Sequence, residues 1–167
     1  LASFAQEESL SVSENCKWRI RHNYEQGIPN GFTVYGYNVK NHELTINEEQ
    51  AVIVREIFDM YLNGKGSNAI ARTLNERGVP APGGDTWHQA RIMQMLRNEK
   101  YIGDLDLQKY YSENHITKRT LVNDGCLKRY YVRENHEPII DRETFDRVQK
   151  IIESKLERHP HIAPYDY

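Results

Sequence analysis

The spacing of hydrophobic residues predicts an amphipathic helix over residues 47–62, the strongest such pattern in the chain. Its apolar side is formed by Ile53, Val54, Ile57, Phe58, Tyr61 and Leu62. Asn47 and Gln50 have the spacing of a capping box at its start, and Gly64 and Gly66 follow its end. We expect this helix to be a scaffold whose acidic residues face solvent.

Two shorter helices are predicted within residues 67–98, one on each side of a wide turn. The first has its apolar side in Ile70, Ala71 and Leu74, and Ser67 is expected to be its N-cap. The segment 78–84 is rich in Gly and Pro, which break a helix. The two helices and their turn therefore have the outline of a helix-turn-helix.

The second of these helices is expected over residues 87–97, with Thr86 and Gln89 spaced as a capping box. Trp87 is expected to be a core anchor because large aromatic side chains usually bury their area. The apolar stripe of this helix is Ile92, Met95 and Leu96. Outside the stripe lie His88, Gln89, Arg91, Gln94 and Asn98.

This polar side suits insertion into the DNA major groove. Arg can form two hydrogen bonds with guanine, and Gln can do so with adenine. By residue type and helix phase, we predict Gln89, Arg91 and Gln94 as base contacts and His88 and Lys100 as phosphate contacts. The alternative, that the face is simply solvated, stays open at this point.

Shorter stretches favour β-strands. Residues 32–39 and 44–46 are suited to a hairpin closed by Asn41 and His42. Residues 105–133 alternate apolar and charged side chains and predict a second, basic hairpin that includes Lys118 and Arg119. Its cations suit phosphate contact, and they equally suit the protection of an edge strand. The predicted fold class is α+β, a helical helix-turn-helix-like core with small β-hairpins and a long N-terminal helix.

The two ends of the chain have separate patterns. Residues 1–25 are expected to be helical with a thin apolar face. Residues 141–156 predict a closing helix that begins at Asp141, and residues 158–167 are expected to be a tail or linker. The chain begins with Leu, and we expect it to be part of a longer protein.

Charge is unevenly distributed although the net charge is only −2. Residues 86–133 hold nine Lys and Arg against five acidic residues, and residues 17–40 hold four against one. A generic affinity for nucleic acid is therefore unexpected, whereas two local basic surfaces suit phosphate.

Other chemistry is not indicated. Cys16 and Cys126 lack metal-ligand spacing and are expected to be reduced thiols in a cytoplasmic protein. No signal peptide, membrane span, phosphate-binding loop or nucleophile motif is present, so we expect no catalysis, metal or cofactor.

The order of several motifs resembles the recombinase domain of large serine recombinases. These motifs are GFTVYGY (31–37), NEEQAVIVREIFDMYLNGKGSNAIARTLNERGVPAP (47–82), TW (86–87), MLRNEKYIGD (95–104) and NHEPIIDRETFDRVQKII (135–152). The resemblance implies that residues 26–157 are a DNA-binding domain without its catalytic domain. It also implies that residues 1–25 are the end of the helix that leaves the catalytic domain.

By this resemblance, Lys17, Arg19, Arg21 and His22 would lie near the DNA backbone or the minor groove. The alternative is a frayed helix with solvated cations. The implied partners are double-stranded attachment-site DNA, the catalytic domain of the same chain and further copies through absent domains, with no membrane. The function implied is attachment half-site binding during DNA integration and excision by a mobile-element protein. Two rivals stay open: a helix-turn-helix transcription regulator and a protein–protein interaction module.

Overall fold

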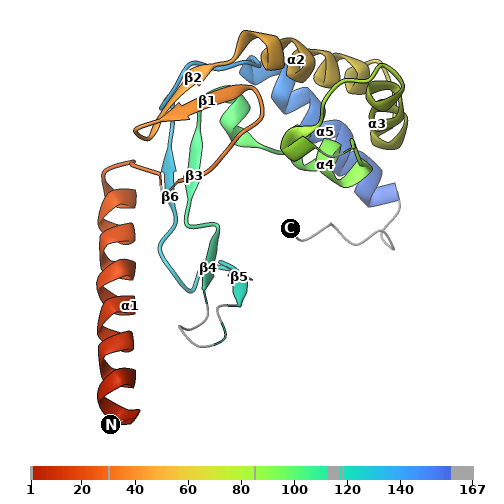
Figure 1. Cartoon of the computed structure of the whole chain (residues 1–167). Coiled ribbons are helices and arrows are strands. Elements are labelled where there is room, and N and C mark those ends of the chain that lie inside the picture. Colours follow the sequence, from red (N-terminus) through yellow and green to blue (C-terminus); the bar gives the residue numbers. More distant parts are fainter. Residues whose placement is uncertain (1, 30, 85, 113–116, 118, 159–167) are drawn as a thin grey trace.

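The computed structural model describes residues 2–29, 31–84, 86–112, 117 and 119–158 of the 167-residue chain. A core of helices is joined to short antiparallel strand pairs, and helix α1 (Ala2–Glu25) extends away from that core (Figure 1). The predicted α+β class, with its long N-terminal helix and small hairpins, is confirmed.

Helix α2 (Glu48–Leu62) is the scaffold that the sequence predicts. Asn47 is its N-cap and accepts a hydrogen bond from the Gln50 backbone N–H at 3.2 Å. The Gln50 side chain does not complete the capping box; its Oε1 accepts the Gly36 N–H at 2.9 Å. The buried side of the helix is formed by Ala51, Val54, Ile57, Phe58 and Tyr61. Gln50 thus ties the preceding loop to the scaffold.

Helices α3 (Ser67–Glu76) and α4 (Gln89–Leu96) form the predicted helical pair, but both predicted caps are wrong. Gly66, not Ser67, is the N-cap of α3, and Ser67 is buried in the first turn. His88 is the N-cap of α4 and makes no capping hydrogen bond through its side chain. Thr86 instead places its Oγ1 3.2 Å from His88 Nε2.

The turn between these helices includes a short 3-10 segment, η1 (Pro82–Gly84), and leads to a core tryptophan. Trp87 is 2% exposed, and its indole Nε1 donates to the Val79 carbonyl at 2.9 Å. Trp87 also meets Tyr35 edge to face, with ring centroids 5.3 Å apart. The expected role of Trp87 as a core anchor is confirmed. Because its indole N–H has an acceptor, burying the ring leaves no unsatisfied hydrogen-bond donor.

Helix α5 (Arg142–Arg158) closes the core. Asp141 caps it as predicted, since Asp141 Oδ1 accepts the Thr144 N–H at 2.8 Å. Its buried residues Phe145, Val148 and Ile152 pack with α2 and α4. The helix continues two residues beyond the predicted 156, and the predicted tail from residue 159 lies outside the described residues.

Strands β1 (Tyr37–Lys40) and β2 (Glu43–Ile46) form the first predicted hairpin. The turn residues Asn41 and His42 have φ values of 50° and 67°. Positive φ at both central positions is what a two-residue turn with the right twist requires, and Asn tolerates it better than most residues.

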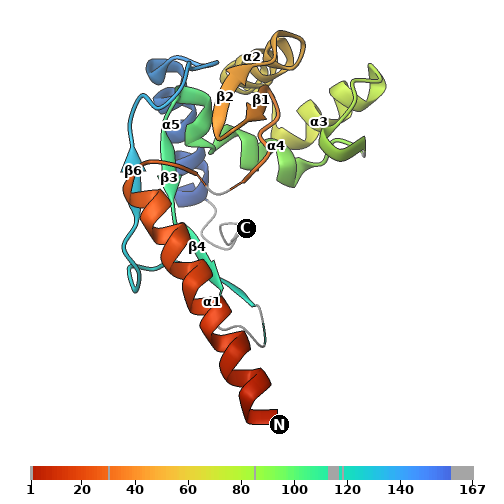
Figure 2. The same ribbon diagram turned by 60° about the vertical axis from the view of Figure 1, so that its left-hand side comes forward.

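The predicted hairpin over 105–133 is divided into two strand pairs. Strand β3 (Leu105–Leu107) pairs with β6 (Tyr130–Val132), and farther out β4 (Tyr110–Ser112) pairs with β5 (Thr120–Val122). We call residues 105–132 the arm. In Figures 1 and 2 the arm and α1 leave the core on the same side. Within the described residues, no helix is both long and apolar enough to cross a membrane.

Candidate nucleic-acid interface

Helix α4 is held firmly from its buried side. Ile92 and Leu96 have no exposed area, and Met95 is 5% exposed. Asn75 on α3 accepts the Trp87 N–H at 2.8 Å and donates to the Trp87 carbonyl at 2.9 Å. This pair of hydrogen bonds fixes the start of α4 against α3. The role of Asn75 was not predicted, since Asn75 belongs to neither apolar stripe.

Of the three predicted base contacts, two lie on the outside of α4. Gln89 and Gln94 are exposed, whereas Arg91 is half-buried. The Arg91 guanidinium donates to the Pro82 carbonyl in the wide turn. Arg91 therefore also stabilises the turn, a role that residue type and helix phase did not indicate.

The predicted phosphate contacts near α4 have different surroundings. His88 is exposed at the N-cap beside Thr86. Lys100 is half-buried in η2 (Glu99–Ile102), where its Nζ lies 3.1 Å from Glu99 Oε1 and 5.2 Å from the centroid of the Phe32 ring. The positive charge of Lys100 is therefore largely balanced by contacts within the protein.

A groove of about 570 Å³ separates α4 from the loop that precedes β1. Its lining includes Thr33, Tyr35, Gln50, Arg91, Gln94 and Asn98. Polar groups from the loop and from α4 thus border one surface hollow. The contributions of Thr33 and Gln50 were not predicted, because the two residues come from segments interpreted as strand and scaffold.

The acidic side of α2 pairs with cations outside α4. Glu48 Oε2 lies 3.8 Å from Arg55 Nη1, and Glu56 accepts a hydrogen bond from Arg77. Arg77 caps the C-terminal end of α3. These two carboxylates are therefore engaged away from Gln89 and Gln94.

The three predicted cations of α1 lie in the C-terminal half of the helix. Lys17 pairs with Glu14 at 2.9 Å, and Arg21 Nε donates to the Lys17 carbonyl at 3.4 Å. Arg19 and Arg21 are exposed, and Lys17 is half-buried. Surface pairs of this kind are weak, so they leave the side chains able to exchange partners.

The cations of the arm are mostly used within the protein. Lys109 pairs with Glu99, Arg129 pairs with Asp106, and Lys128 Nζ lies 4.9 Å from the centre of the Tyr130 ring. Of the two cations singled out from the sequence, Arg119 is exposed and Lys118 lies outside the described residues. The base of the arm is therefore an internal ionic cluster and not an open basic patch.

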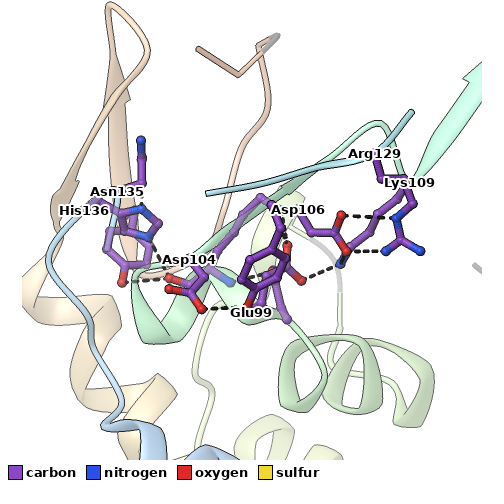
Figure 3. Close-up of polar contacts among 11 residues, drawn as sticks. Glu99, Asp104, Asp106, Lys109, Arg129, Asn135 and His136 are labelled. Atoms are coloured by element: carbon purple, nitrogen blue, oxygen red, sulfur yellow. Dashed lines mark hydrogen bonds and ion pairs between the residues drawn. The ribbon is translucent and has the colours of Figure 1, made fainter. Parts of the chain in front are cut away.

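Two buried carboxylates organise this cluster (Figure 3). Glu99 is 7% exposed and contacts Lys100, Lys109 and the Asp106 N–H. Burial by itself would raise the pKa of the Glu99 carboxyl, but the attraction of Lys100 and Lys109 outweighs it and lowers that pKa. Glu99 is thus held as a buried anion.

Asp104 lies between η2 and β3 and is fully buried. It accepts hydrogen bonds from the Tyr131 hydroxyl at 2.6 Å, the Glu134 N–H at 3.1 Å and Arg142 at 3.0 Å. Burial opposes its ionisation, yet these donors lower the pKa of Asp104. Burial and the Asp104 acceptor in turn raise the pKa of Tyr131 to about 12. Neither carboxylate was predicted, because both lie between the helix and the hairpin that the spacing of apolar residues indicated.

Among the described residues, no group of three or more His, Cys, Asp or Glu side chains is placed to hold a metal ion. Both cysteines, Cys16 and Cys126, are exposed free thiols. The arrangement instead offers a rigidly mounted helix with an exposed amide-bearing face.

Comparisons with known proteins agree with the family that the order of the motifs indicates. The sequence profile of the Recombinase family matches residues 48–155. A protein of Bacillus subtilis (strain 168) named "Putative DNA recombinase" is 28% identical over 149 residues, which cover 80% of this chain and 29% of that protein.

Two solved structures share the fold. One, an LSR–DNA complex, has a TM-score of 0.60 and 24% identity and covers 91% of this chain and 41% of its own. The other, from work on the Listeria innocua prophage attP site, has a TM-score of 0.59 and 25% identity and covers 90% and 55%. The chain therefore spans about a third to a half of the length of these relatives.

The profile match extends over more than half of the sequence, and the chain belongs to the Recombinase family. The resemblance to the recombinase domain of large serine recombinases, which the motifs predicted, is confirmed.

Proposed function

We propose that this chain binds DNA sequence-specifically, at attachment half-sites, as the non-catalytic part of a large serine recombinase of a mobile element. The observation that carries the proposal is the mounting of α4. Trp87 and Asn75 fix its start, its apolar stripe is buried, and Gln89 and Gln94 remain exposed on the opposite side. A short helix supported in this way is the element that enters a major groove.

The exposed amides would supply sequence choice. Gln89 and Gln94 each carry one acceptor and two donors, which can pair with the N6 and N7 edge of adenine. Arg91, already bonded to the Pro82 carbonyl, has further N–H groups that can face a guanine. These three residues are the proposed base contacts.

Contacts with the DNA backbone would come from residues on α4, on α1 and on the arm. His88 lies at its N-cap, Arg19 and Arg21 lie on α1, and Arg119 lies on the arm. Lys17, Lys100 and Lys118 complete the proposed set. Lys17 and Lys100 would exchange the carboxylates of Glu14 and Glu99 for phosphate. Such contacts add affinity for any DNA sequence and make it salt-dependent.

Strand cleavage by the whole protein would come from a serine in a catalytic domain outside this chain. The chain's contribution would be to hold the attachment site while that domain acts. Integration, excision and assembly of several copies on DNA are therefore proposed for the whole protein and not for this part alone.

Fluorescence anisotropy with DNA duplexes tests the proposal. The chain is titrated with a duplex from each end of its own mobile element and with a scrambled duplex of equal composition. We expect tighter binding to the element ends, by roughly tenfold or more, because base contacts typically contribute about 1–3 kcal/mol each. Equal affinity for both duplexes would reject sequence-specific binding, and no affinity at low salt would favour a protein-interaction module.

The phosphate contacts are tested by the double variant Arg19→Ala with Arg21→Ala. It should weaken binding to both duplexes alike and reduce the slope of log affinity against log salt by roughly two, about one per contact. Lys150→Ala, which removes one cation from the exposed side of α5, is the control and should leave the slope unchanged. A loss confined to the element-end duplex would show that these arginines do not act through phosphate.

A further inference from the structure

The direction of α1 has little direct support from the core. The helix ends at a turn in which the Ile28 N–H donates to the Asn23 carbonyl at 2.9 Å. The next residue, Pro29, is buried, and its carbonyl lies 2.8 Å from His42 Nδ1 in the β1–β2 turn. These contacts hold the connection, but they lie at one end of a 24-residue helix. A helix held only by the backbone that follows it would be free to change direction.

The arm supplies a second support for α1. The rings of Tyr24 and Tyr130 are 6.3 Å apart, and the Tyr130 hydroxyl donates to Glu25 Oε1 at 3.3 Å. A Cβ at Gly27 would lie 3.4 Å from a methyl group of Val132, so the turn and β6 are already in close contact. Farther along, a groove of about 500 Å³ lies between the two, lined from α1 by Lys17, Ile20, Arg21 and Tyr24 and from the arm by Tyr111 and Leu127.

The arm is in turn fixed at its base by the two buried carboxylates. Glu99 in η2 pairs with Lys109, which lies between β3 and β4. Asp104 accepts hydrogen bonds from the Tyr131 hydroxyl of β6 and from the Arg142 guanidinium of α5. One carboxylate therefore holds each side of the arm, and both belong to the segment that follows α4.

The junction between the two strand pairs is fixed by one buried amide. Asn123, 2% exposed, donates to the Gln108 and Leu127 carbonyls at 2.9 and 2.8 Å. Its Oδ1 accepts the N–H groups of Gly125 and Leu127, both at 3.1 Å. Gln108 beside it has a φ of 66°, a conformation that such a network can maintain. The bend within the arm is therefore set by specific hydrogen bonds.

We propose that the arm is a strut, a rigid support that fixes the direction of α1 relative to α4. The support runs from Glu99 and Asp104 at the base, through β6, to Tyr130 against the last turn of α1. Tyr130 and Glu99 are positioning residues in this proposal. The strut exists with or without DNA; its consequence, a set distance between the bound half-site and the far end of α1, rests on the proposed function.

Distance distributions from pulsed electron–electron double resonance test the strut in the free protein. Spin labels at Ser9→Cys on α1 and Lys150→Cys on α5 report the direction of α1, in a background carrying Cys16→Ser and Cys126→Ser. The parent should give one narrow distribution. Tyr130→Ala should broaden it at least about twofold, because a helix with few remaining contacts samples more orientations. Tyr130→Phe, which keeps the ring, should stay close to the parent.

A second label pair separates the steps of the support. Labels at Thr120→Cys on β5 and Lys150→Cys report the arm itself. Tyr130→Ala should broaden the α1 distribution and leave the arm distribution narrow, whereas Glu99→Gln should broaden both. Arg133→Ala, an exposed neighbour of β6, is the control and should change neither. Far-ultraviolet circular dichroism of each variant shows whether the core remains folded.

An α1 distribution that is already broad in the parent, or unchanged by Tyr130→Ala in a folded protein, overturns the strut. DNA affinity measured on the same variants keeps the two proposals apart. If the strut fails, the element-end affinity of the chain stays as it was. If DNA binding fails, the distance distributions still decide the strut.

Discussion

The core and the arm are stabilised by different physical means. Around α4, apolar side chains do the work: Trp87, Ile92 and Leu96 are at most 2% exposed and pack with residues from α2, α3 and α5. At the base of the arm, ion pairs and hydrogen bonds converge on Glu99 and Asp104. Apolar packing is nondirectional, whereas a buried carboxylate accepts only correctly placed donors. The difference suits the roles proposed for the two regions, a stable core that reads DNA and an arm with one defined direction.

The largest expected effect is in the core. Trp87→Ala should lower the free energy of unfolding by about 3–5 kcal/mol, because it removes a large buried ring and leaves a cavity. Chemical denaturation followed by circular dichroism measures this. Trp18→Ala is the matched control, since Trp18 is 66% exposed on α1 and should change stability little. Equal losses of unfolding free energy in the two variants would contradict the placement of Trp87 in the core.

The next effect is at the base of the arm. Asp104→Asn removes the charge that accepts Tyr131 and Arg142, and hydrogen bonds to a charged group contribute about 1.5–3 kcal/mol. We expect a loss of that order in the free energy of unfolding. Asp124→Asn, an exposed residue of the arm, should have a negligible effect in the same titration. A neutral Asp104→Asn would mean that the buried cluster does not secure the arm.

The same carboxylates give the arm a pH dependence that the apolar core lacks. The pKa values of Glu99 and Asp104 are both lowered in the folded state. Their contribution to stability is therefore complete above the unfolded values of about 4 and is lost as pH falls through the lowered folded values. Denaturation midpoints between neutral pH and about pH 3 should fall more steeply for the parent than for Asp104→Asn. Parallel curves would indicate that Asp104 is not held as an anion.

A smaller effect is expected at the start of α5. Asp141→Ala removes an N-cap that accepts the Thr144 N–H at 2.8 Å, and such caps contribute about 1 kcal/mol. Asp146→Ala, exposed within the same helix, tests whether the loss depends on the cap position. Both are measured by thermal unfolding, and only Asp141→Ala should lower the midpoint.

The same contrast explains which parts of the structure could be predicted from sequence. Periodic apolar residues located α2, α3, α4 and α5, because helical spacing reports directly on which side is buried. Capping was less certain: Asn47 and Asp141 were correct, whereas Ser67 and Thr86 were not. Chain geometry after a turn, which local residue types do not fix, decides which residue takes the cap.

The buried polar cluster could not be predicted in the same way. Glu99 meets Lys109 ten residues later, and Asp104 meets Arg142 thirty-eight residues later. No periodicity connects such partners, so the cations of the arm were interpreted from residue type alone. The structure shows that Lys109 and Arg129 have carboxylate partners within the protein. The same limit applies to Arg91, whose contact with Pro82 crosses the wide turn.

The exposed face of α4 carries the central claim, and a specificity measurement on Gln94→Ala tests it most directly. Gln94 is exposed and makes no contribution to the buried stripe, so the variant should fold as the parent does. Affinity for the element-end duplex and for its scrambled counterpart is measured in parallel, with Gln6→Ala on exposed α1 as the matched control. We expect a loss of about 1–3 kcal/mol on the element-end duplex alone. An unchanged affinity, or an equal loss on both duplexes, would contradict the assignment of α4 as the helix that reads DNA.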